Sequence, residues 1–481
     1  MRAWWAALAA ITALRLLVAY AAPMAPDEAY YWVWSHALAP GFLDHPPMVA
    51  LCIKLGTLIA GQGNLGVRLL SPLFAALGSV MLVQAGEDLF PGTKAGLRAA
   101  LLLNATLIFA AGATTMTPDV PLLLFWTATL WALARLRRTG NGWWWIVAGI
   151  AAGLALDSKY TAVLLAPSIL VWLVISREMR PWLRRPQPYL AALVAGVVFA
   201  PVMLWNAEHG WASFAKQGGR AADWSPSRAL QFIGELFAGQ LGLATPLIAV
   251  LAGAGAVLAI RRARHGDARW TLLASLTTIP ALVFLQHALG DRVQANWPAI
   301  LYPSAALAAA GLSGFWRRLY VPAVGLGALL TALVWTQATL APLHLSMMRD
   351  PTLLRLGGWS SLASQIDSIA SAQAAEFIAD DNYGHAALLS RLLPTHWQVI
   401  GAEGRWALFN LPTPGHALVG HTGLLVRSAR RDDEPEMGRW SSVTRLPLIS
   451  RARGGMVAED FRLYRVTLAP DATGLAVMPR P

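Results

Sequence analysis

Segment 23–47, PMAPDEAYYWVWSHALAPGFLDHPP, gathers acidic and imidazole side chains among aromatic residues. It contains the carboxylates Asp27, Glu28 and Asp44, and His45 follows the last of them. Only 13% of the chain is charged and 56% is apolar, so acids next to a long apolar run are unusual enough to indicate a function. A carboxylate shielded by aromatic rings is suited to act as general base for an attacking hydroxyl.

Each of these residues also has a structural interpretation. Asp27 and Glu28 follow Pro26 at an expected helix start, where carboxylates cap free N–H groups and suit the helix dipole. Capping accounts for one acid and accounts less well for Glu28 and Asp44. Asp44 and His45 could hold a divalent metal with another outer carboxylate, or Asp44 could simply lie in a turn.

Polar residues recur at later helix starts. Asp119 follows Thr117-Pro118, where a cap and a function explain it equally well. Lys159 begins an apolar helix, where the positive end of the dipole disfavours a lysine unless a phosphate binds there. A pair with Asp157 is the alternative, and Asn296-Trp297-Pro298 marks a helix start that is either a cap or part of a substrate wall.

The elements that must position these residues are membrane spans. A mean hydropathy of +0.48 and 22 tryptophans indicate a polytopic α-helical membrane protein. The net charge of +12 does not indicate nucleic acid, because the basic residues form short clusters between apolar runs. We predict about eleven (11–13) transmembrane helices, near 4–22, 66–86, 96–113, 118–136, 143–157, 160–176, 189–206, 240–260, 270–288, 297–314 and 320–341.

The distribution of basic residues predicts the orientation of these helices. With the N-terminus in the cytoplasm, all basic clusters of the membrane part fall on the cytoplasmic side, as the positive-inside rule requires. These clusters are Lys94 and Arg98; Arg135, Arg137 and Arg138; Arg177, Arg180, Arg184 and Arg185; Arg261, Arg262, Arg264 and Arg269; and Arg317 and Arg318. The acids of segment 23–47 and Lys159 then lie on the outer side, where we expect one shared, partly wet cavity.

Two further regions complete the predicted architecture. Within the first outer loop, 27–38 and 48–60 read as juxtamembrane helices. After a transmembrane domain, 1–342, the tail 343–481 reads as a small periplasmic α/β domain. Its predicted helices are 359–375 and 384–393, and its predicted strands are 376–380, 397–400, 417–427 and 456–467.

The ordered motifs PDEAYYWVWS, LDHPPMVA, TPDVPLLLFW, DSKYTAVLLAP, LWNAEHGWASF and QANWPAILYP resemble those of bacterial family-39 glycosyltransferases. These are relatives of the protein O-mannosyltransferases and of the lipid A aminoarabinose transferases. The resemblance covers about residues 20–310. It implies a GT-C-like fold and a polyprenyl-phosphate-linked sugar as donor.

The resemblance also implies roles for individual residues. Asp27 and the adjacent Glu28 match the catalytic acids, and Asp44 matches an acid near a bound metal in the aminoarabinose transferases, so a divalent ion is the one cofactor implied. His45 stands where those relatives usually carry a lysine, which leaves Lys159 as the better phosphate ligand. The implied donor-phosphate ligands are Lys159, Arg220 and Arg292, and the implied substrate contacts are Tyr30, Tyr31, His45, Asp119, Tyr160, Asn296 and Trp297.

The expected function is transfer of a sugar from a polyprenyl-phosphate carrier to a cell-envelope acceptor on the periplasmic face of the bacterial inner membrane. The acceptor class spans lipid A or lipopolysaccharide, another glycan, or protein, and a single displacement would invert the anomeric carbon. If the acceptor is itself a phosphate, Asp27 orients the sugar instead of acting as base. The alternatives are a lipid-linked-sugar transporter or flippase, and a scaffold whose tail binds envelope glycan.

Overall fold

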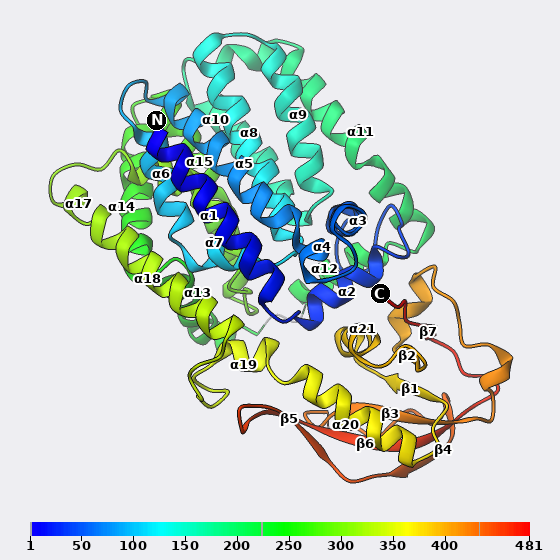
Figure 1. Cartoon of the computed structure of the whole chain (residues 1–481). Coiled ribbons are helices and arrows are strands. Elements are labelled where there is room, and N and C mark those ends of the chain that lie inside the picture. Colours follow the sequence, from blue (N-terminus) through cyan, green and yellow to red (C-terminus); the bar gives the residue numbers. More distant parts are fainter. Residues whose placement is uncertain (1, 223–224, 432) are drawn as a thin grey trace. The chain divides into compact units, whose positions relative to one another are not determined.

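The computed structural model describes residues 2–222, 225–431 and 433–481. It consists mostly of helices, with one sheet near the C-terminus (Figure 1). Contacts divide the chain into two compact units. The helical unit comprises Met1–Leu16, Pro40–Val49 and Leu70–Leu333, and the tail unit comprises Leu17–Ala39, Ala50–Leu69 and Val334–Pro481. The tail therefore clusters with most of the first outer loop, while the predicted boundary near residue 342 stays a prediction.

The helical unit is a bundle of apolar helices in which α5, α8, α9 and α11 pack side by side in that order (Figure 1). Its helices are α5 (Leu70–Leu89), α6 (Ala95–Asn104), α7 (Leu107–Gly112), α8 (Asp119–Thr139), α9 (Trp143–Leu156), α10 (Leu165–Ile175), α11 (Gln187–Glu208), α12 (Ala212–Ala222), α13 (Ala229–Leu243), α14 (Pro246–Ala263), α15 (Ala268–Ala288), α16 (Tyr302–Ala309) and α17 (Phe315–Arg318). The 3-10 turns are η1 (Tyr160–Leu164), η2 (Arg180–Arg184), η3 (Pro226–Arg228) and η4 (Trp297–Leu301). Helices α1 (Arg2–Ala21) and α18 (Tyr320–Thr339) each contribute to both units.

Small residues allow α9 and α11 to approach closely. A Cβ added at Gly153 would lie 2.7 Å from the Cβ of Val198, so only glycine fits at this position. Close contact through small residues is a common way for helices to associate in membranes, where lipid removes the hydrophobic driving force. The glycine at this interface is therefore explained by its small size, not by its hydrophobicity.

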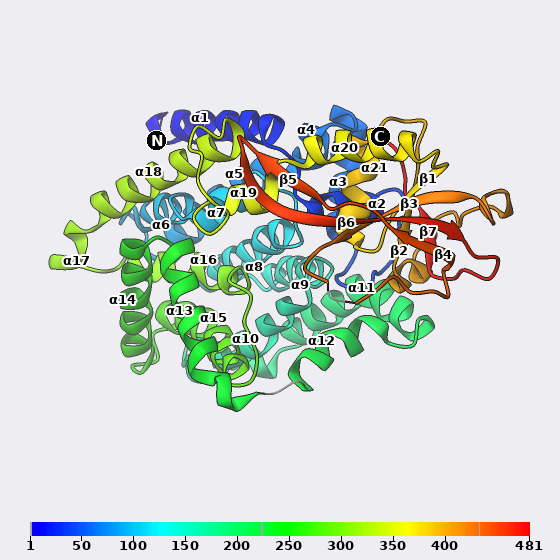
Figure 2. The ribbon, with the colours of Figure 1, turned by 90° about the horizontal axis from the view of Figure 1, so that it is seen from below.

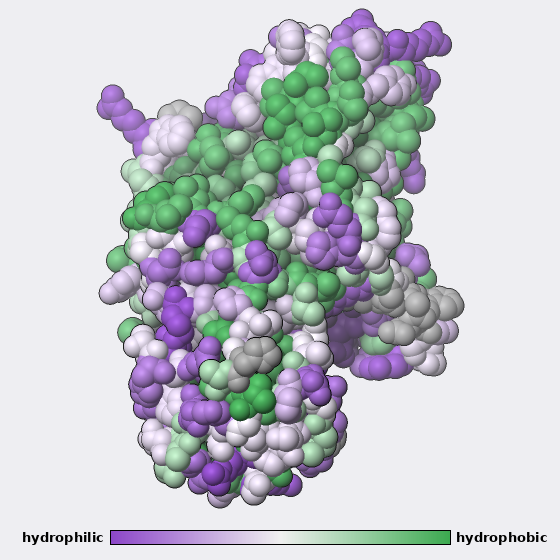
Figure 3. Space-filling model, turned by 90° about the vertical axis from the view of Figure 1, so that its right-hand side faces the viewer, coloured by the Kyte–Doolittle hydropathy of each residue, from purple (hydrophilic) through white to green (hydrophobic). Residues whose placement is uncertain are grey.

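The protein is a multi-pass membrane protein. Within the described residues, seven helices are long and apolar enough to cross a membrane, and four more apolar helices have 10–17 residues. On α11, Leu193, Val197 and Leu204 are 62, 64 and 65% exposed, as lipid-facing residues should be. Figure 3 shows a wide hydrophobic area on the side that carries α11 in Figure 1.

Each of the eleven predicted spans overlaps a helix, but several of them are not continuous α-helices. The run 96–113 is broken after Asn104, because Thr106 caps α7 by accepting the N–H of Phe109 at 3.2 Å. The run 297–314 consists of η4 followed by the short α16. The exact number of membrane crossings stays a prediction.

The tail unit combines the outer-loop helices with an α/β fold. Its helices are α2 (Pro26–Trp34), α4 (Asn64–Arg68), α19 (Pro351–Leu356), α20 (Trp359–Ala372) and α21 (Tyr383–Leu392), and α3 (Met48–Ala60) lies mostly in it. Its strands are β1 (Phe377–Asp380), β2 (Gln398–Ala402), β3 (Thr422–Ser428), β4 (Trp440–Arg445), β5 (Ile449–Arg453), β6 (Met456–Leu468) and β7 (Leu475–Val477), and the 3-10 turns η5 (Gly404–Leu408) and η6 (His416–Leu418) lie between β2 and β3.

The sheet has the order β4-β6-β3-β1-β2-β7, with β5 pairing on β6. Strands β1, β2 and β3 are parallel, and the outer strands are antiparallel. Helices α20 and α21 cover the same face of this sheet (Figure 2). The central strand β1 ends at Asp380 and α21 begins at Tyr383, so the first turn of α21 lies just beyond the carboxyl end of β1.

Most elements predicted for the tail are confirmed. Both predicted helices match α20 and α21, and the predicted strands match β1, β2, β3 and β6, although β3 begins at Thr422. Strands β4, β5 and β7 were missed, because β4 carries mostly exposed polar residues and β7 has three residues. In the outer loop, 48–60 matches α3, whereas the helix predicted at 27–38 ends at Trp34.

Candidate active site

Asp27 lies in the first turn of α2, which Pro26 starts with its fixed φ. Its side chain is 48% exposed. The hydroxyl of Tyr383 donates a hydrogen bond to Oδ1 at 3.4 Å, and Nη1 of Arg355 lies 3.9 Å from Oδ2. Asp27 is thus an accessible carboxylate with a phenol on one oxygen and a loosely held cation near the other.

Glu28, in contrast, is buried and bound. Arg68 donates to both of its carboxylate oxygens, at 2.7 and 2.6 Å, and the N–H of Ala25 donates to Oε2 at 3.2 Å. Our interpretation that capping explains Glu28 less well is wrong, since its carboxylate binds a backbone N–H of the first turn. Arg68 was not identified from the sequence as the partner of Glu28. Its position was a usable signal, because it is the single charged residue of the apolar stretch 64–86.

Arg68 connects three parts of the tail unit. Besides Glu28, its guanidinium donates to the carbonyl oxygens of Ala19, Ala22 and Pro23, at 3.1, 2.7 and 2.8 Å. Both Arg68 and Glu28 are fully buried, at 0 and 1% exposure. The pair therefore fixes the end of α1 against α2, and with it the position of Asp27.

The two tyrosines of α2 differ in their surroundings. Tyr30 is 2% exposed and packs against Tyr383, with ring centroids 4.4 Å apart, and its hydroxyl accepts from Arg405 at 3.3 Å. Tyr31 lies edge-on to Trp34 at 5.0 Å. Tyr30 thus belongs to the packing between α2 and the tail.

In the helical unit, three predicted site residues form one cluster. Lys159 Nζ lies 2.7 Å from Asp119 Oδ1, and Asn296 donates to Asp119 Oδ2 at 2.7 Å. Asp119 is the first residue of α8, Lys159 precedes η1 and Asn296 precedes η4, so three helix starts converge here. The side chain of Lys159 is only 6% exposed. The alternative pair of Lys159 with Asp157 is wrong, because the lysine binds Asp119.

Asp44 is also paired with a lysine. Its Oδ1 lies 2.5 Å from Lys216 Nζ of α12, and its carbonyl accepts from Gln217 at 2.8 Å. His45 follows it in segment Pro40–Val49, which clusters with the helical unit. Within the described residues, no group of three or more His, Cys, Asp or Glu side chains could hold a metal ion.

Four predicted site residues remain, namely Tyr160, Arg220, Arg292 and Trp297. Arg292 forms an exposed ion pair with Glu235, at 2.5 Å, and does not join Lys159. Trp297 packs on His287 and Tyr160 packs on Phe214, with ring centroids 5.5 and 5.2 Å apart. Arg220 belongs to α12, and its side chain lies outside the described part of the chain.

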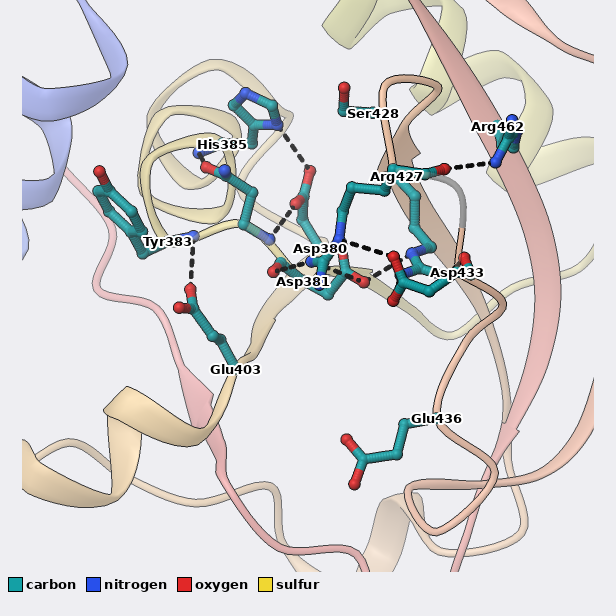
Figure 4. Close-up of polar contacts among 12 residues, drawn as sticks. Asp380, Asp381, Tyr383, His385, Glu403, Arg427, Ser428, Asp433, Glu436 and Arg462 are labelled. Atoms are coloured by element: carbon teal, nitrogen blue, oxygen red, sulfur yellow. Dashed lines mark hydrogen bonds and ion pairs between the residues drawn. The ribbon is translucent and has the colours of Figure 1, made fainter. Parts of the chain in front are cut away.

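A buried charged cluster supports the turn that carries Tyr383. Asp380, at the end of β1, is fully buried, and burial, reinforced by Asp381, raises its pKa well above the usual value. His385 lies with Nδ1 3.8 Å from Asp380 Oδ2, and neither atom has a hydrogen-bond partner among the described residues. Burial lowers the pKa of His385 to about 4. Figure 4 shows the two side chains facing each other, with Arg427 bound to Asp381 and Asp433 beside them.

His385 should make the stability of this turn depend on pH. The pKa of its ring is about 4 when folded and 6.5 when unfolded, so between these values only the unfolded chain gains the proton. The free energy of opening should therefore fall by about 3 kcal/mol as the pH drops from 6.5 to 4. The raised pKa of Asp380 has the opposite effect, since it lowers the free energy of opening as the pH rises above 3.8. The contribution of His385 is therefore the difference in the free energy of opening between wild type and His385→Phe.

Hydrogen exchange of the α21 amides, measured by mass spectrometry between pH 4.5 and 7 and corrected for intrinsic rates, would report this difference. The phenylalanine fits among Trp359 and Phe461, whose rings lie 5.0 and 5.4 Å from that of His385. Identical pH dependence in wild type and His385→Phe would show that His385 does not make the stability of this turn depend on pH.

Comparison with known proteins finds several glycosyltransferases to which this chain is similar. A family model described as dolichyl-phosphate-mannose-protein mannosyltransferase matches residues 44–205. The lipid A galacturonosyltransferase RgtD of Rhizobium johnstonii is 27% identical over 367 residues, which cover 74% of this chain and 75% of that protein. An undecaprenyl phosphate-alpha-4-amino-4-deoxy-L-arabinose arabinosyl transferase of Sodalis glossinidius is 26% identical over 164 residues, 30% of this chain and 29% of that protein.

The likeness extends to the whole fold. The crystal structure of apo ArnT from Cupriavidus metallidurans matches with a TM-score of 0.62 at 15% identity, covering 96% of this chain and 98% of that one. The chain therefore has a GT-C-like fold. The undecaprenyl phosphate-bound form of the same GT-C protein matches with a TM-score of 0.63 at 14% identity. The GT-C-like fold expected from the motifs is thereby confirmed, including the sheet domain after the helices.

Proposed function

We propose that this GT-C protein transfers a sugar from a polyprenyl-phosphate carrier to lipid A on the periplasmic face of the bacterial inner membrane. The proposal rests on one observation above all, namely the alignment with a lipid A galacturonosyltransferase over three quarters of both chains. The N-terminus would then lie in the cytoplasm and the C-terminal domain, 343–481, in the periplasm. Such an arrangement suits the chemistry, because donor and acceptor are both anchored in the membrane.

Asp27 is the general base in this proposal. An acceptor hydroxyl attacks the anomeric carbon, the bond from that carbon to the phosphate oxygen breaks, and Asp27 takes the hydroxyl proton. The electron pair of the broken bond leaves with the phosphate, and the anomeric configuration inverts. Glu28 holds α2 through Arg68 instead of touching the substrate, because both of its oxygens already accept from that guanidinium.

The departing phosphate requires positive charge. We assign this role to Lys159, whose ammonium has three N–H donors and donates one hydrogen bond to Asp119. Asp119 and Asn296 fix its position, and Arg220 and Arg292 stay further candidates. Tyr31, His45, Tyr160 and Trp297 stay proposed substrate contacts, whereas Tyr30 is assigned to packing.

A metal is not used in this mechanism. Asp44, which the resemblance places near an ion, has its carboxylate on Lys216, and the described residues contain no group of three or more His, Cys, Asp or Glu side chains that could hold a metal ion. We therefore derive no step through a metal and assign Asp44 to the positioning of α12.

Lys159→Met should weaken binding of undecaprenyl phosphate by about 10- to 100-fold, the usual effect of losing a hydrogen bond to a charged group. Asn296→Ala should weaken it less, because Asn296 acts only through Asp119. Tryptophan fluorescence quenching or calorimetry of the purified protein in nanodiscs would measure both affinities. Equal affinity in wild type and Lys159→Met would remove the lysine from the phosphate site.

The function itself is tested by incubating the purified chain in nanodiscs with a radiolabelled polyprenyl-phosphate sugar and lipid A. Galacturonic acid and 4-amino-4-deoxyarabinose are the first sugars to try, since the relatives named above transfer them. We expect label on lipid A. Movement of the labelled carrier across liposomes without transfer would favour a flippase, an alternative that none of these relatives supports.

A further inference from the structure

The helix that carries Asp27 is docked on the C-terminal domain. Gly384, at the start of α21, lies so close to Pro26 that an added Cβ would come within 2.8 Å of the proline Cβ. Towards the other end, the guanidinium of Arg391 lies over the ring of Trp32 at 4.4 Å. The same arginine donates to the carbonyl of Gln62 at 2.6 Å, and Trp32 donates to the side chain of Gln62 at 2.9 Å. Helix α2 is thus held on α21 along its length.

This docking brings one side chain of the tail to the carboxylate of Asp27. Tyr383 is the first residue of α21, and its hydroxyl donates to Asp27 Oδ1 at 3.4 Å. Its position is fixed by Glu403 and Arg405. Glu403 Oε2 accepts the backbone N–H of Tyr383 at 3.1 Å, while Glu403 Oε1 accepts from Arg405 at 2.8 Å. Figure 4 shows Glu403 beneath the backbone of Tyr383.

Arg405 closes the network on the ring of Tyr383. Its guanidinium lies 3.9 Å from the Tyr383 ring centroid, and it donates to the hydroxyl of Tyr30 at 3.3 Å. A cation over an aromatic face is attractive, and the gain increases when the pair is shielded from water. The phenol of Tyr383 is therefore clamped at its backbone and at its ring.

We propose that Tyr383 is a positioning residue for the general base, and that Glu403 and Arg405 hold it in place, so the C-terminal domain is part of the catalytic apparatus. This inference rests on the proposed function of Asp27. A phenol that donates to Oδ1 stabilises the ionised carboxylate, the form that takes the proton from the acceptor hydroxyl. Charged groups near Asp27 include Arg355 of α19 and the neighbouring Glu28, which is tied to Arg68.

The test compares Tyr383→Phe with wild type in the nanodisc transfer assay described above. We expect kcat to fall by roughly 3- to 10-fold with KM unchanged, since one hydrogen bond is lost and no substrate contact is removed. The acidic limb of the pH profile of kcat/KM should move to higher pH, because the carboxylate loses a donor. Glu403→Gln keeps an acceptor for the backbone N–H and loses the ion pair with Arg405, so the same shift should appear with smaller size.

Tyr464→Phe is the matched control, because it makes the same change on β6 of the same domain, and it should leave both kcat and the pH profile as in wild type. If Tyr383→Phe and Glu403→Gln both keep the wild-type kcat and pH profile while Asp27→Asn is inactive, the inference is wrong and the proposed function stands. If Asp27→Asn is fully active, the proposed base is wrong and the inference fails with it.

Discussion

Asp27→Asn should lower the rate of sugar transfer by about 10²- to 10⁴-fold, the contribution expected of a general base. The amide has the shape of the carboxylate but takes up no proton, so the acceptor hydroxyl must attack unassisted. Because the side chain is 48% exposed, the substitution should leave folding unchanged. Transfer by the purified protein, followed at saturating donor and acceptor, measures the loss.

Asp471→Asn is the control for this variant, since Asp471 is an exposed acid of the same chain and should tolerate the change. A loss of less than about tenfold in Asp27→Asn would mean that no base is needed. That outcome is expected if the acceptor group is a phosphate, which is already ionised, and Asp27 would then orient the sugar.

Arg68→Met should destabilise the protein by about 3–5 kcal/mol, because it leaves the buried carboxylate of Glu28 without its partner. The carbonyls of Ala19, Ala22 and Pro23 lose their donor at the same time. Unfolding in mixed micelles, monitored by tryptophan fluorescence, would give the change. Arg137→Met, which breaks the exposed pair with Glu178, should cost no more than about 1 kcal/mol.

The double variant Arg68→Met with Glu28→Met distinguishes the ion pair from the loss of packing. Without the buried carboxylate, part of the stability should return, although the three carbonyls still lack a donor. A double variant as unstable as the sum of the two single variants would show that Glu28 and Arg68 act independently.

The sequence predicts those features that follow from local pattern. Helix α3 is fixed by an apolar run between Pro47 and Gly61, and α20 and α21 follow from the spacing of their apolar residues. The helix dipole at Lys159 indicated a phosphate or Asp157 as the anionic partner of this lysine. The structure pairs it with Asp119 instead, which the sequence could not indicate because Asp119 is distant along the chain and Asp157 is near.

The sequence did not predict which residues pair when they lie far apart along the chain. Glu28 and Arg68 lie on different helices, and only the folded chain shows that one binds the other. Tyr383 and Arg405 looked like ordinary residues of an accessory domain, since nothing local marks a tyrosine that meets a carboxylate more than three hundred residues earlier. The docking of α2 on α21 is a product of tertiary packing alone.

The central claim is most directly tested by mass spectrometry of lipid A from cells that carry the gene, lack it, or carry Asp27→Asn. We predict one additional sugar on lipid A in the first strain and its absence in the other two, with the variant protein present in the membrane at normal level. Identical lipid A in all three strains would contradict the assignment of this chain as a lipid A glycosyltransferase.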